Sequence, residues 1–560
     1  YDNGNGYTKP AAYTTKSKKD FSFAFVGDPQ IGSSNELKGS DTAEFYQAQS
    51  DAVRNDSFNW NTTLNEAMDK TGGNASFVVS AGDQIQTTKK KSPGKSEMTS
   101  EIEYTGYLSP DVLKSLPVAT TVGNHDADNA NYTYHFNTPN SSDLGSNGVV
   151  GGDYYFTYGN TLFMMLNTQD TNAAEHKQFM EQAIAANPNC TWRVVTLHQD
   201  IYGSAEHSNE PEITNLRYTL VPYFEANDVD VVLTGHDHAY SRTHILEGGH
   251  KTVEYTDDEF DAELDKDMDA GENPATRYEA PANISADSKE PADVAYLNYL
   301  NAVMDKDAVE DTEKGETVVN PDGILYMTAN SSSGSKYYDL VPRMQSYIAN
   351  RWQEDVPTYS VIDVTDNTFT INTYRTDNDQ KIDETFTIKK GVTEDIKSAS
   401  VGKVKNQIYT GKQIQPALKV TLNGKTLKAG KDYTVTYTDN KNTGLAKATI
   451  NGIGKYTGTQ TVTFKIVPKK AVLKTVKAGK SGTATVTIGK AGGKVSGYAI
   501  QVSTDSSFKK VTTYRTAKTT YTLKNLSKGK TYYVRVKAFT KVSDKNVYGA
   551  ASKTIKVKAK

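Results

Sequence analysis

Cysteine is almost absent from this sequence, because Cys190 is the only one among 560 residues. An intrachain disulfide is therefore excluded. A reducing cytoplasm and secretion by an organism that does not rely on disulfides would both explain this scarcity. Long apolar runs are missing as well, since none approaches the roughly 18 residues that a transmembrane helix needs. We therefore expect no membrane span. Because the sequence starts at Tyr1 rather than Met, we expect a processed or trimmed product.

Negative charge is nearly absent from the last third of the chain. From Lys389 to Lys560 the sequence holds 36 of the 63 Lys and Arg residues but only 6 of the 67 Asp and Glu residues. This break in charge predicts a domain boundary near residue 390. The lysines are evenly spread and no base-stacking motif accompanies them, so we expect no nucleic-acid specificity. We favour a solvated basic surface that could adhere to anionic cell-wall polymers.

The acidic part of the chain has the pattern of an α/β domain. Residues 1–20 are polar, and we interpret them as a linker or the end of a truncated N-terminal domain. Between residues 21 and 390, short apolar strands alternate with amphipathic helices. An acidic stretch at about residues 254–311 interrupts this pattern, and we interpret it as a solvated surface insertion. The expected strands are Phe21–Val26, Phe77–Ser80, Val118–Val122, Leu162–Leu166, Val194–Leu197, Val229–Leu233, Gly323–Thr328, Tyr359–Val364 and Thr368–Tyr374, and the expected helices are Asp41–Asp69, Asn172–Ala186 and Glu212–Asn227.

The basic part of the chain has no helical period. Residues 391–468 and residues 469–560 each contain short Thr-, Val- and Tyr-rich strands, with turn signals at intervals of about eight to twelve residues. This pattern predicts two all-β sandwiches.

Five polar motifs stand at or just after strand ends in the α/β part. In α/β sheets, ligands gather outside the carboxyl ends of the strands. A buried strand that is followed by Gly and then Asp, Asn or His therefore places polar groups where the sheet stops. Each motif alone is typical of a turn or a buried core residue, and only the ordered set indicates a site. The motifs are Gly27-Asp28-Pro29-Gln30, Gly82-Asp83-Gln84, Gly123-Asn124-His125-Asp126, Leu197-His198 and Gly235-His236-Asp237-His238.

The residue types of these motifs predict a metal site. Carboxylate, amide oxygen and imidazole without thiolate suit hard to borderline metal ions. Two ions that lie close together need a bridging ligand, and the two oxygens of a carboxylate can serve. We expect Asp83 to bridge. The first ion would then take Asp28, Gln30 and His238, and the second Asn124, His198 and His236.

The ordered motifs resemble the calcineurin-like metallophosphoesterase superfamily. The segment GHDHAYSR (Gly235–Arg242) is similar to a motif of the purple acid phosphatase branch, and TLHQDIYGS (Thr196–Ser204) is similar to another. The resemblance covers about residues 21–390. It implies a four-layer αββα sandwich with a dinuclear site at its edge.

The same resemblance implies roles for further residues. Two metal ions would lower the pKa of a shared water, which becomes a hydroxide nucleophile that attacks a phosphate monoester. His125 is the general-acid candidate, and an imidazole suits that task. We expect Asp126 to orient it. His207, nine residues after His198, matches a substrate-side histidine of purple acid phosphatases, and a surface-loop histidine is the alternative.

Two departures from the family pattern leave the metal open. Purple acid phosphatases have an iron-binding Tyr three residues after the Asp of the Gly-Asp motif, whereas this sequence has Gln86 there. The first motif carries Gln30 where the wider superfamily usually has His, and an amide oxygen is a harder and weaker ligand than imidazole. We therefore expect a colourless enzyme with iron, manganese or zinc.

The two C-terminal units also resemble known modules. The first is similar to a bacterial Ig-like repeat and the second to a fibronectin type III domain, both of which recur in surface and secreted proteins of Gram-positive bacteria. This pairing predicts an extracellular or cell-wall-associated protein. Spacer or cell-wall attachment is the favoured role of the modules, and carbohydrate binding is the alternative.

Three functional hypotheses follow. The first is a secreted phosphatase that acts on phosphorylated small molecules. The second is a phosphodiesterase or nucleotidase that uses the same site. The third is a surface adhesin or scaffold with an inert phosphoesterase domain. It is disfavoured because every residue that we expect to bind metal has a side chain that can coordinate an ion. We expect specificity to depend on Lys89–Gly106, Asp128–Gly151 and the acidic insertion.

Overall fold

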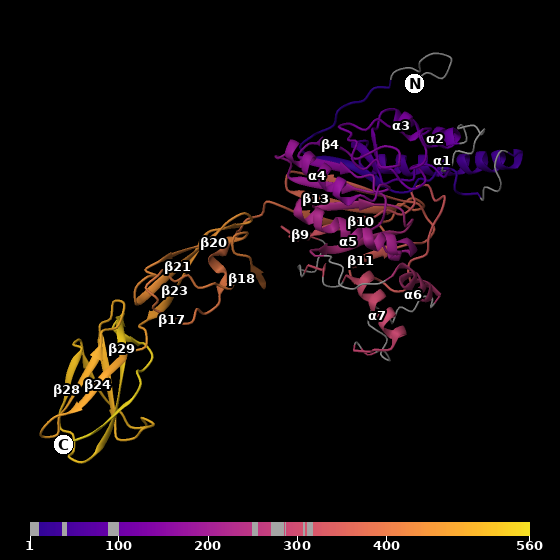
Figure 1. The fold of residues 1–560 in the computed structure, drawn as a ribbon. Helices are drawn as coiled ribbons and strands as arrows, with labels where there is room; N and C mark the ends of the chain where they lie inside the picture. The colour runs from indigo at the N-terminus through magenta and orange to yellow at the C-terminus, as the bar shows by residue number, and fades with distance from the viewer. Residues whose placement is uncertain are drawn as a thin grey trace. The chain divides into compact units, whose positions relative to one another are not determined.

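The chain separates into two compact units, residues 1–390 and residues 391–560 (Figure 1). The computed structural model describes residues 11–35, 42–87, 100–248, 256–269, 285, 287–305, 308–310 and 317–560. Residues 11–17 have no regular secondary structure and are mostly exposed. Within the described residues, no helix is long and apolar enough to cross a membrane.

One of the two sheets of the larger unit is a seven-stranded mixed sheet, built from strands near both ends of the unit's sequence. Its strand order is β3–β2–β1–β12–β13–β14–β9. The three strands β1, β2 and β3 are parallel, and β12 runs antiparallel to β1 with Phe23 opposite Ile362. The strands are β1 (Phe21–Val26), β2 (Ala75–Ser80), β3 (Val118–Thr120), β9 (Thr317–Val319), β12 (Thr358–Val364), β13 (Thr368–Arg375) and β14 (Phe386–Lys389).

A second seven-stranded mixed sheet has the order β11–β8–β10–β7–β6–β5–β4. The four neighbours β10, β7, β6 and β5 are parallel, and Val194 of β6 lies opposite Val231 of β7. The strands are β4 (Tyr154–Tyr158), β5 (Thr161–Met165), β6 (Trp192–Thr196), β7 (Val231–Thr234), β8 (Tyr240–Leu246), β10 (Ile324–Thr328) and β11 (Ile348–Trp352).

The main hydrophobic core lies between the two sheets. Phe23 and Val79 from the first sheet share one buried cluster with Phe163, Leu233 and Met327 from the second. The rings of Phe23 and Phe163 meet edge to face with centroids 5.3 Å apart. Alternate residues of a strand point to opposite faces, so each strand also supplies an outer apolar row that needs a cover.

Helices supply that cover on both sides. Trp60 and Leu64 of α1 (Ala43–Lys70) pack on the outer face of the first sheet. Phe179 of α4 (Ala173–Ala186) and Leu220 of α5 (Pro211–Ala226) pack on the outer face of the second. The side chain of Thr42 caps α1 by accepting a hydrogen bond from the Phe45 amide at 3.1 Å. The order helix, sheet, sheet, helix is the predicted αββα arrangement, which is therefore confirmed.

The acidic stretch is more structured than its composition predicts. Its described part contains α6 (Asp257–Asp269) and α7 (Pro291–Met304), which share a small buried core that includes Phe260 and Tyr299. The hydroxyl of Tyr218 on α5 donates to the Ala302 carbonyl at 2.6 Å. The interpretation as a merely solvated insertion is corrected for these residues, because their apolar side chains recur at helical spacing and bury one another. The rest of the stretch, and the segment of residues 88–99 expected to influence specificity, lie outside the described residues.

Strands alone form the regular structure of the smaller unit, apart from one short 3-10 turn (Ile396–Ser398). The predicted all-β character of both C-terminal modules is confirmed. The first module contains β15 (Glu394–Asp395), β16 (Ser400–Val401), β17 (Gln407–Ile408), β18 (Val420–Leu422), β19 (Lys425–Leu427), β20 (Tyr433–Thr438), β21 (Gly444–Gly452), β22 (Tyr456–Thr457) and β23 (Thr459–Val467). The second contains β24 (Val472–Ala478), β25 (Ala484–Gly489), β26 (Gly497–Ser503), β27 (Thr512–Thr516), β28 (Thr520–Leu523), β29 (Thr531–Val542), β30 (Lys545–Tyr548) and β31 (Ile555–Lys558).

Candidate metal centre

The carboxyl ends of parallel strands from both sheets meet at one edge of the larger unit. The loop after β1 joins the loop after β2 through a hydrogen bond from the Gln30 amide to the Asp83 carbonyl at 2.8 Å. Gly27 also forms a parallel bridge with Ser331, which follows β10 in the other sheet. The Gly235 amide, after β7, donates to the His198 carbonyl, after β6, at 2.9 Å. The five polar motifs therefore converge.

Glycine at two positions makes this convergence sterically possible. A Cβ atom on Gly123 would lie 2.1 Å from Asp83 Oδ1, and one on Gly235 would lie 2.5 Å from Asp28 Oδ2. Both distances are far below van der Waals contact. The glycine that precedes each polar residue thus lets neighbouring loops approach closely enough to bring their side chains together.

Strained backbone marks the same loops. Five of the seven predicted ligands are non-glycine residues in the left-handed region, a conformation that costs on the order of 1 kcal/mol or more per residue. Contacts with the surrounding structure must hold these residues in their strained conformations. Such residues cluster at functional sites. Their φ angles are 48° for Asp28, 35° for Gln30, 47° for Asp83, 74° for His236 and 47° for His238.

Asp28, Asp83 and His198 form the buried centre of the cluster. One ligand atom from each lies within 4.8 Å of the others. His198 Nε2 is 3.5 Å from Asp83 Oδ1, and His198 Nδ1 is 3.9 Å from Asp28 Oδ1. His238 Nε2 lies 3.6 Å from Asp28 Oδ1, which extends the cluster to the second histidine of the His-x-His motif.

The remaining predicted ligands border this centre. Asn124 Oδ1 lies 3.0 Å from His198 Nε2, and His236 Nδ1 lies 3.1 Å from the same nitrogen. Gln30 Oε1 is buried and has no hydrogen-bond partner among the described residues. A buried, unpaired amide oxygen is costly unless something else satisfies it, and a cation would do so.

Backbone carbonyls orient two of the histidine rings. His198 Nδ1 lies 2.8 Å from the Ala81 carbonyl oxygen, and His238 Nδ1 lies 2.8 Å from the Lys336 carbonyl oxygen. A carbonyl oxygen accepts only, so Nδ1 carries the proton and Nε2 of each ring is left as a ligand. The Asp28 carboxylate is held in turn by the His236 amide at 2.9 Å.

The electrostatics of the cluster favour a bound cation. Burial raises the pKa of Asp28 well above its ordinary value, and the nearby Asp83 carboxylate raises it further. Burial opposes the charge on Asp83 too, but His198 and His125 hold its pKa below the ordinary value. Burial lowers the pKa of His198, yet the Asp83 and Asp28 carboxylates raise it to about 9. Divalent cations in place of the protons on Asp28 and His198 would let the Asp28 carboxylate ionise beside that of Asp83, so this donor set fits them.

Burial keeps the other two histidines neutral. It lowers the pKa of His238 to about 3. It also lowers the pKa of His236 well below the ordinary value, and the positive charge of His198 adds to this effect. Neutral imidazole is the form that binds a metal, so both rings are ready to act as ligands.

His125 lies beside the cluster but faces a different partner. Its amide donates to Asp83 Oδ1 at 2.9 Å, and its Nδ1 lies 2.6 Å from the Gln86 carbonyl oxygen. Nδ1 therefore carries a proton toward that carbonyl, and Nε2 is the ring nitrogen that can exchange a proton with a ligand. The ring is only partly buried, as a proton donor to substrate must be.

The expectation that Asp126 orients His125 is corrected. Asp126 Oδ2 accepts from the Gly123 amide at 3.0 Å and the Gln84 amide at 3.4 Å. The Gln86 carbonyl takes the orienting position instead. Burial raises the pKa of Asp126 well above its ordinary value. Asp126 thus stabilises the loop that presents Asn124 and joins it to the loop after β2, and it does not orient the His125 ring.

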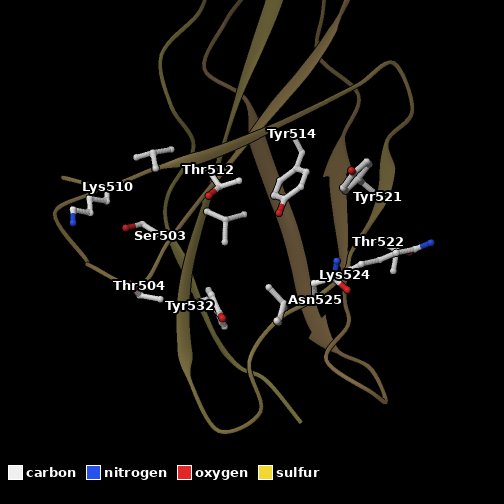
Figure 2. Close-up of a pocket in the computed structure, with 13 residues that line it drawn as sticks. Ser503, Thr504, Lys510, Thr512, Tyr514, Tyr521, Thr522, Lys524, Asn525 and Tyr532 are labelled. Atoms are coloured by element: carbon white, nitrogen blue, oxygen red, sulfur yellow. The ribbon is translucent and has the colours of Figure 1, made fainter.

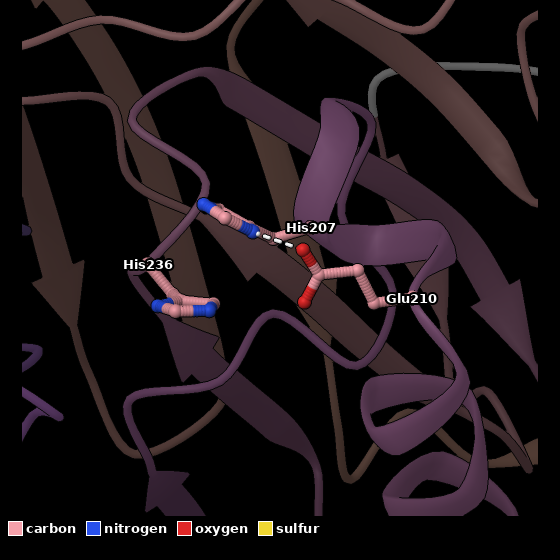
Figure 3. A group of neighbouring side chains, drawn as sticks. All are labelled: His207, Glu210 and His236. Carbon is pink, nitrogen blue, oxygen red and sulfur yellow. Dashed lines mark hydrogen bonds and ion pairs between the residues drawn. The ribbon is translucent and has the colours of Figure 1, made fainter. Parts of the chain in front are cut away.

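His207 lies at the border of the cluster rather than on a detached surface loop. Figure 3 shows its ring beside His236 and bonded to Glu210. The rings of His207 and His236 stack with centroids 4.6 Å apart, and His207 Nδ1 is 2.6 Å from Glu210 Oε1. Asp237 fixes the loop by accepting from the His207 amide at 3.1 Å. His207, Glu210 and His236 form a second group whose ligand atoms lie close enough together to hold a metal ion.

Three residues of this site have no motif in the sequence. Glu210 is one, and Tyr338 and Lys336 on the loop after β10 are the others. The Tyr338 ring meets His207 and His238 edge to face, with centroid distances of 4.5 and 5.1 Å. Lys336 Nζ donates to the Tyr338 hydroxyl and lies 4.4 Å from the ring centre. Only the fold brings this loop to the histidines.

Comparison with known families matches two parts of the chain. Residues 21–240 match the model of the calcineurin-like phosphoesterase family, and residues 473–554 match the fibronectin type III domain. The first match contains every predicted metal ligand, from Asp28 to His238.

Individual relatives are distant. An uncharacterized protein of Mycobacterium tuberculosis strain H37Rv is 26% identical over 156 residues, which is 24% of this chain and 29% of that protein. The serine/threonine-protein phosphatase CPPED1 of Pongo abelii is 25% identical over 251 residues, 41% of this chain and 73% of that protein. A purple acid phosphatase from yellow lupin seeds has 14% identity and a TM-score of 0.40, with 68% of this chain and 55% of that chain covered.

Proposed function

We propose that this chain, which contains a calcineurin-like metallophosphoesterase domain and a C-terminal fibronectin type III domain, is a dinuclear phosphatase that hydrolyses phosphate monoesters. The observation that carries the proposal is the convergence of two buried carboxylates, three imidazoles and two amide side chains at one sheet edge. Asp28, Asp83 and His198 lie at its centre.

The seven polar side chains divide into two ligand sets that share Asp83. Asp28, Gln30 and His238 would hold one cation. Asn124, His198 and His236 would hold the other. When bound, two such cations lower the pKa of a water molecule and offset the negative charge of the phosphoryl group. Iron, manganese and zinc all suit these donors, because the donors are carboxylate, amide oxygen and imidazole groups.

His125 supplies the proton that the leaving alkoxide needs. The Gln86 carbonyl holds Nδ1, so that the proton is delivered from Nε2. His207, which stacks on His236, and Lys336, which donates to Tyr338, present nitrogen donors that bind phosphoryl oxygens. Tyr338 separates and fixes both groups, since its ring packs on His207 and its hydroxyl accepts from Lys336.

A direct comparison of esters tests the proposal. Hydrolysis of p-nitrophenyl phosphate is measured beside bis-p-nitrophenyl phosphate, with manganese, zinc or iron supplied to the metal-free chain. We expect faster cleavage of the monoester. Faster cleavage of the diester would contradict this proposal and support the hypothesis of a phosphodiesterase or nucleotidase. If the folded chain binds no metal and cleaves neither ester, only the hypothesis of an inert scaffold remains.

We also propose an extracellular or cell-wall-associated location. The support is the composition of the C-terminal unit, whose first module is similar to a bacterial Ig-like repeat, and the scarcity of cysteine. Immunodetection in medium, wall and cytoplasmic fractions of the source cells tests this. The location is rejected if the chain stays with a cytoplasmic marker.

A further inference from the structure

The fibronectin type III module contains an open cavity of about 780 Å³ (Figure 2). It lies between β27 and β28, which belong to the two different sheets of this module. The walls include the aromatic rings of Tyr514, Tyr521 and Tyr532. A volume of this size is in the range of small-ligand sites, which are typically about 300–1,000 Å³.

The three tyrosines are held in place by the core of the module. All three pack against the buried cluster that contains Val534 and Val536. The centroids of Tyr514 and Tyr521 are 5.6 Å apart with an interplanar angle of 39°. The Tyr532 hydroxyl accepts a hydrogen bond from the Ser527 amide at 3.0 Å. Rings that are fixed before binding lose little conformational freedom when a ligand arrives.

Hydroxyl and amide groups line the rest of the cavity. Ser503, Thr504, Thr512, Thr522 and Asn525 are among the lining residues, and Figure 2 shows them around the same space as the tyrosines. A hydroxyl group both donates and accepts hydrogen bonds. A wall dense in such groups therefore complements a ligand that is itself rich in hydroxyls.

The charge of the module points to an anionic ligand. Lys510 and Lys524 line the cavity, lie on opposite sides of it in Figure 2 and are exposed, whereas the lining includes no Asp or Glu. Residues 469–560 hold 22 Lys and Arg residues against Asp505 and Asp544. The Asp505 carboxylate already accepts from the Ser507 and Lys509 amides. The positive field attracts polyanions and raises their association rate.

We propose that this cavity binds an acidic glycan, a polymer of sugar rings that carry carboxylate or phosphate groups. The tyrosine rings pack against the C–H faces of the sugars. The tyrosine hydroxyls and the other hydroxyl groups of the wall bond the sugar hydroxyls, and the two lysines bind the anionic substituents. A single-stranded nucleic acid fits less well, because the centroids of Tyr514 and Tyr521 are 5.6 Å apart, too close for a base to stack between the two rings. The phosphatase unit is thereby tethered to an anionic polymer.

Binding of the full chain to polygalacturonate, dextran and an oligothymidylate tests the proposal. Dissociation constants are measured at one ionic strength. We expect polygalacturonate to bind more tightly than the other two. Tighter binding of the oligothymidylate would replace the glycan with a nucleic acid. Equal binding of the neutral dextran would refute the role of the lysines.

Matched charge variants then locate the site. The double variant Lys510→Gln with Lys524→Gln removes the two cavity charges, and Lys477→Gln with Lys556→Gln removes two exposed charges of the same module outside it. We expect about tenfold weaker polygalacturonate binding for the first and less than about threefold for the second. If both variants bind polygalacturonate equally weakly, the polymer is attracted only by the overall positive charge of the module, and the proposed site is refuted.

A second pair of substitutions removes hydroxyls without removing packing. Tyr514→Phe with Tyr521→Phe keeps both rings against the core, so the melting temperature stays the same. We expect weaker binding to polygalacturonate by several-fold and unchanged turnover of p-nitrophenyl phosphate, because the metal centre belongs to the other unit. Unchanged affinity would refute the role of these two hydroxyls in binding the glycan.

Discussion

Asn124 Oδ1 lies 3.0 Å from His198 Nε2, although 74 residues separate the two in sequence. Asn124 follows β3 of the first sheet, and His198 follows β6 of the second. The side chains can meet only because both sheets end their parallel strands at the same edge. The metal centre is therefore a property of the pair of sheets and not of either alone.

Replacement of Asn124 by Ala tests this contact. We expect the bound metal to fall from two ions toward one per chain, and turnover of p-nitrophenyl phosphate to fall by about 100-fold or more. Elemental analysis and steady-state kinetics measure the two effects. Asn65→Ala, on the exposed face of α1, is the matched control and leaves both unchanged. Full metal content and turnover in Asn124→Ala would refute the ligand assignment.

The variant Gln30→Leu tests whether Gln30 binds a metal ion or only supports the fold. The unpaired Gln30 Oε1 is buried, so its removal does not lower the melting temperature of the metal-free chain. Metal ions stabilise the native state in proportion to their affinity, so we expect the metal-induced rise in melting temperature to be smaller in the variant. Scanning calorimetry with and without a chelator measures this. An equal rise in both chains would show that Gln30 does not bind metal.

His125→Asn examines the proton donor. We expect kcat for an alkyl phosphate to fall by about 100- to 10,000-fold, because a poor leaving group needs its proton. The loss should be much smaller for p-nitrophenyl phosphate, whose leaving group is stable as an anion. The ratio of the two losses is the measurement. Equal losses with both esters would indicate that His125 acts otherwise than as an acid.

Lys336→Gln addresses substrate binding. Its Nζ group lies beside Tyr338, which packs on His207 and His238. We expect KM for phosphate monoesters to rise by several-fold while kcat stays nearly constant, because a charge that binds substrate and transition state equally affects only KM. Lys381→Gln, an exposed change in the same unit, is the control. A fall in kcat at unchanged KM would contradict a binding role.

Glu103 predicts a pH dependence of stability. It is fully buried and accepts hydrogen bonds from Gln49 Nε2 at 2.7 Å and the Thr87 amide at 2.8 Å. Burial raises its pKa from 4.5 to about 7, with these hydrogen bonds acting in the opposite direction. Because the folded pKa lies above the unfolded one, the native state binds more protons. The contribution to stability is therefore complete below pH 4.5 and is lost as pH rises through about 7.

Glu103→Gln removes this dependence because the amide resembles the protonated acid. We expect the free energy of unfolding of the wild type to fall, relative to the variant, by about 3 kcal/mol between pH 4.5 and pH 7.5. Denaturant unfolding of both proteins at several pH values measures the difference. A constant difference across that range would show that folding does not raise the pKa of Glu103.

Much of the fold and of the ligand set could be read from local pattern. The strand Phe21–Val26 has the predicted bounds, and α4 begins one residue after its prediction. Apolar runs that end in Gly followed by Asp, Asn or His are visible in sequence, because a strand end and its side chains are neighbours in the chain. The residue types alone then predict oxygen and nitrogen ligands.

The surroundings of those ligands depend on contacts that have no local signature. The partner of His125 is the Gln86 carbonyl, and the partner of His198 is the Ala81 carbonyl, 117 residues away. Every residue has such a carbonyl, so no residue type reveals which one will orient a ring. The expectation for Asp126 failed for this reason, since its carboxylate is satisfied by two amides of nearby loops.

The sequence by itself determined the α/β and all-β parts, the break in charge between them and the chemical nature of the site. Periodicity and residue type are local properties, and each of these conclusions needs only them. Only the tertiary structure decided that Glu210, Lys336 and Tyr338 stand beside the histidines and that three tyrosines line a cavity in the last module. Such neighbours are set by the packing of distant strands and loops, where side-chain volume and hydrogen bonding are satisfied jointly.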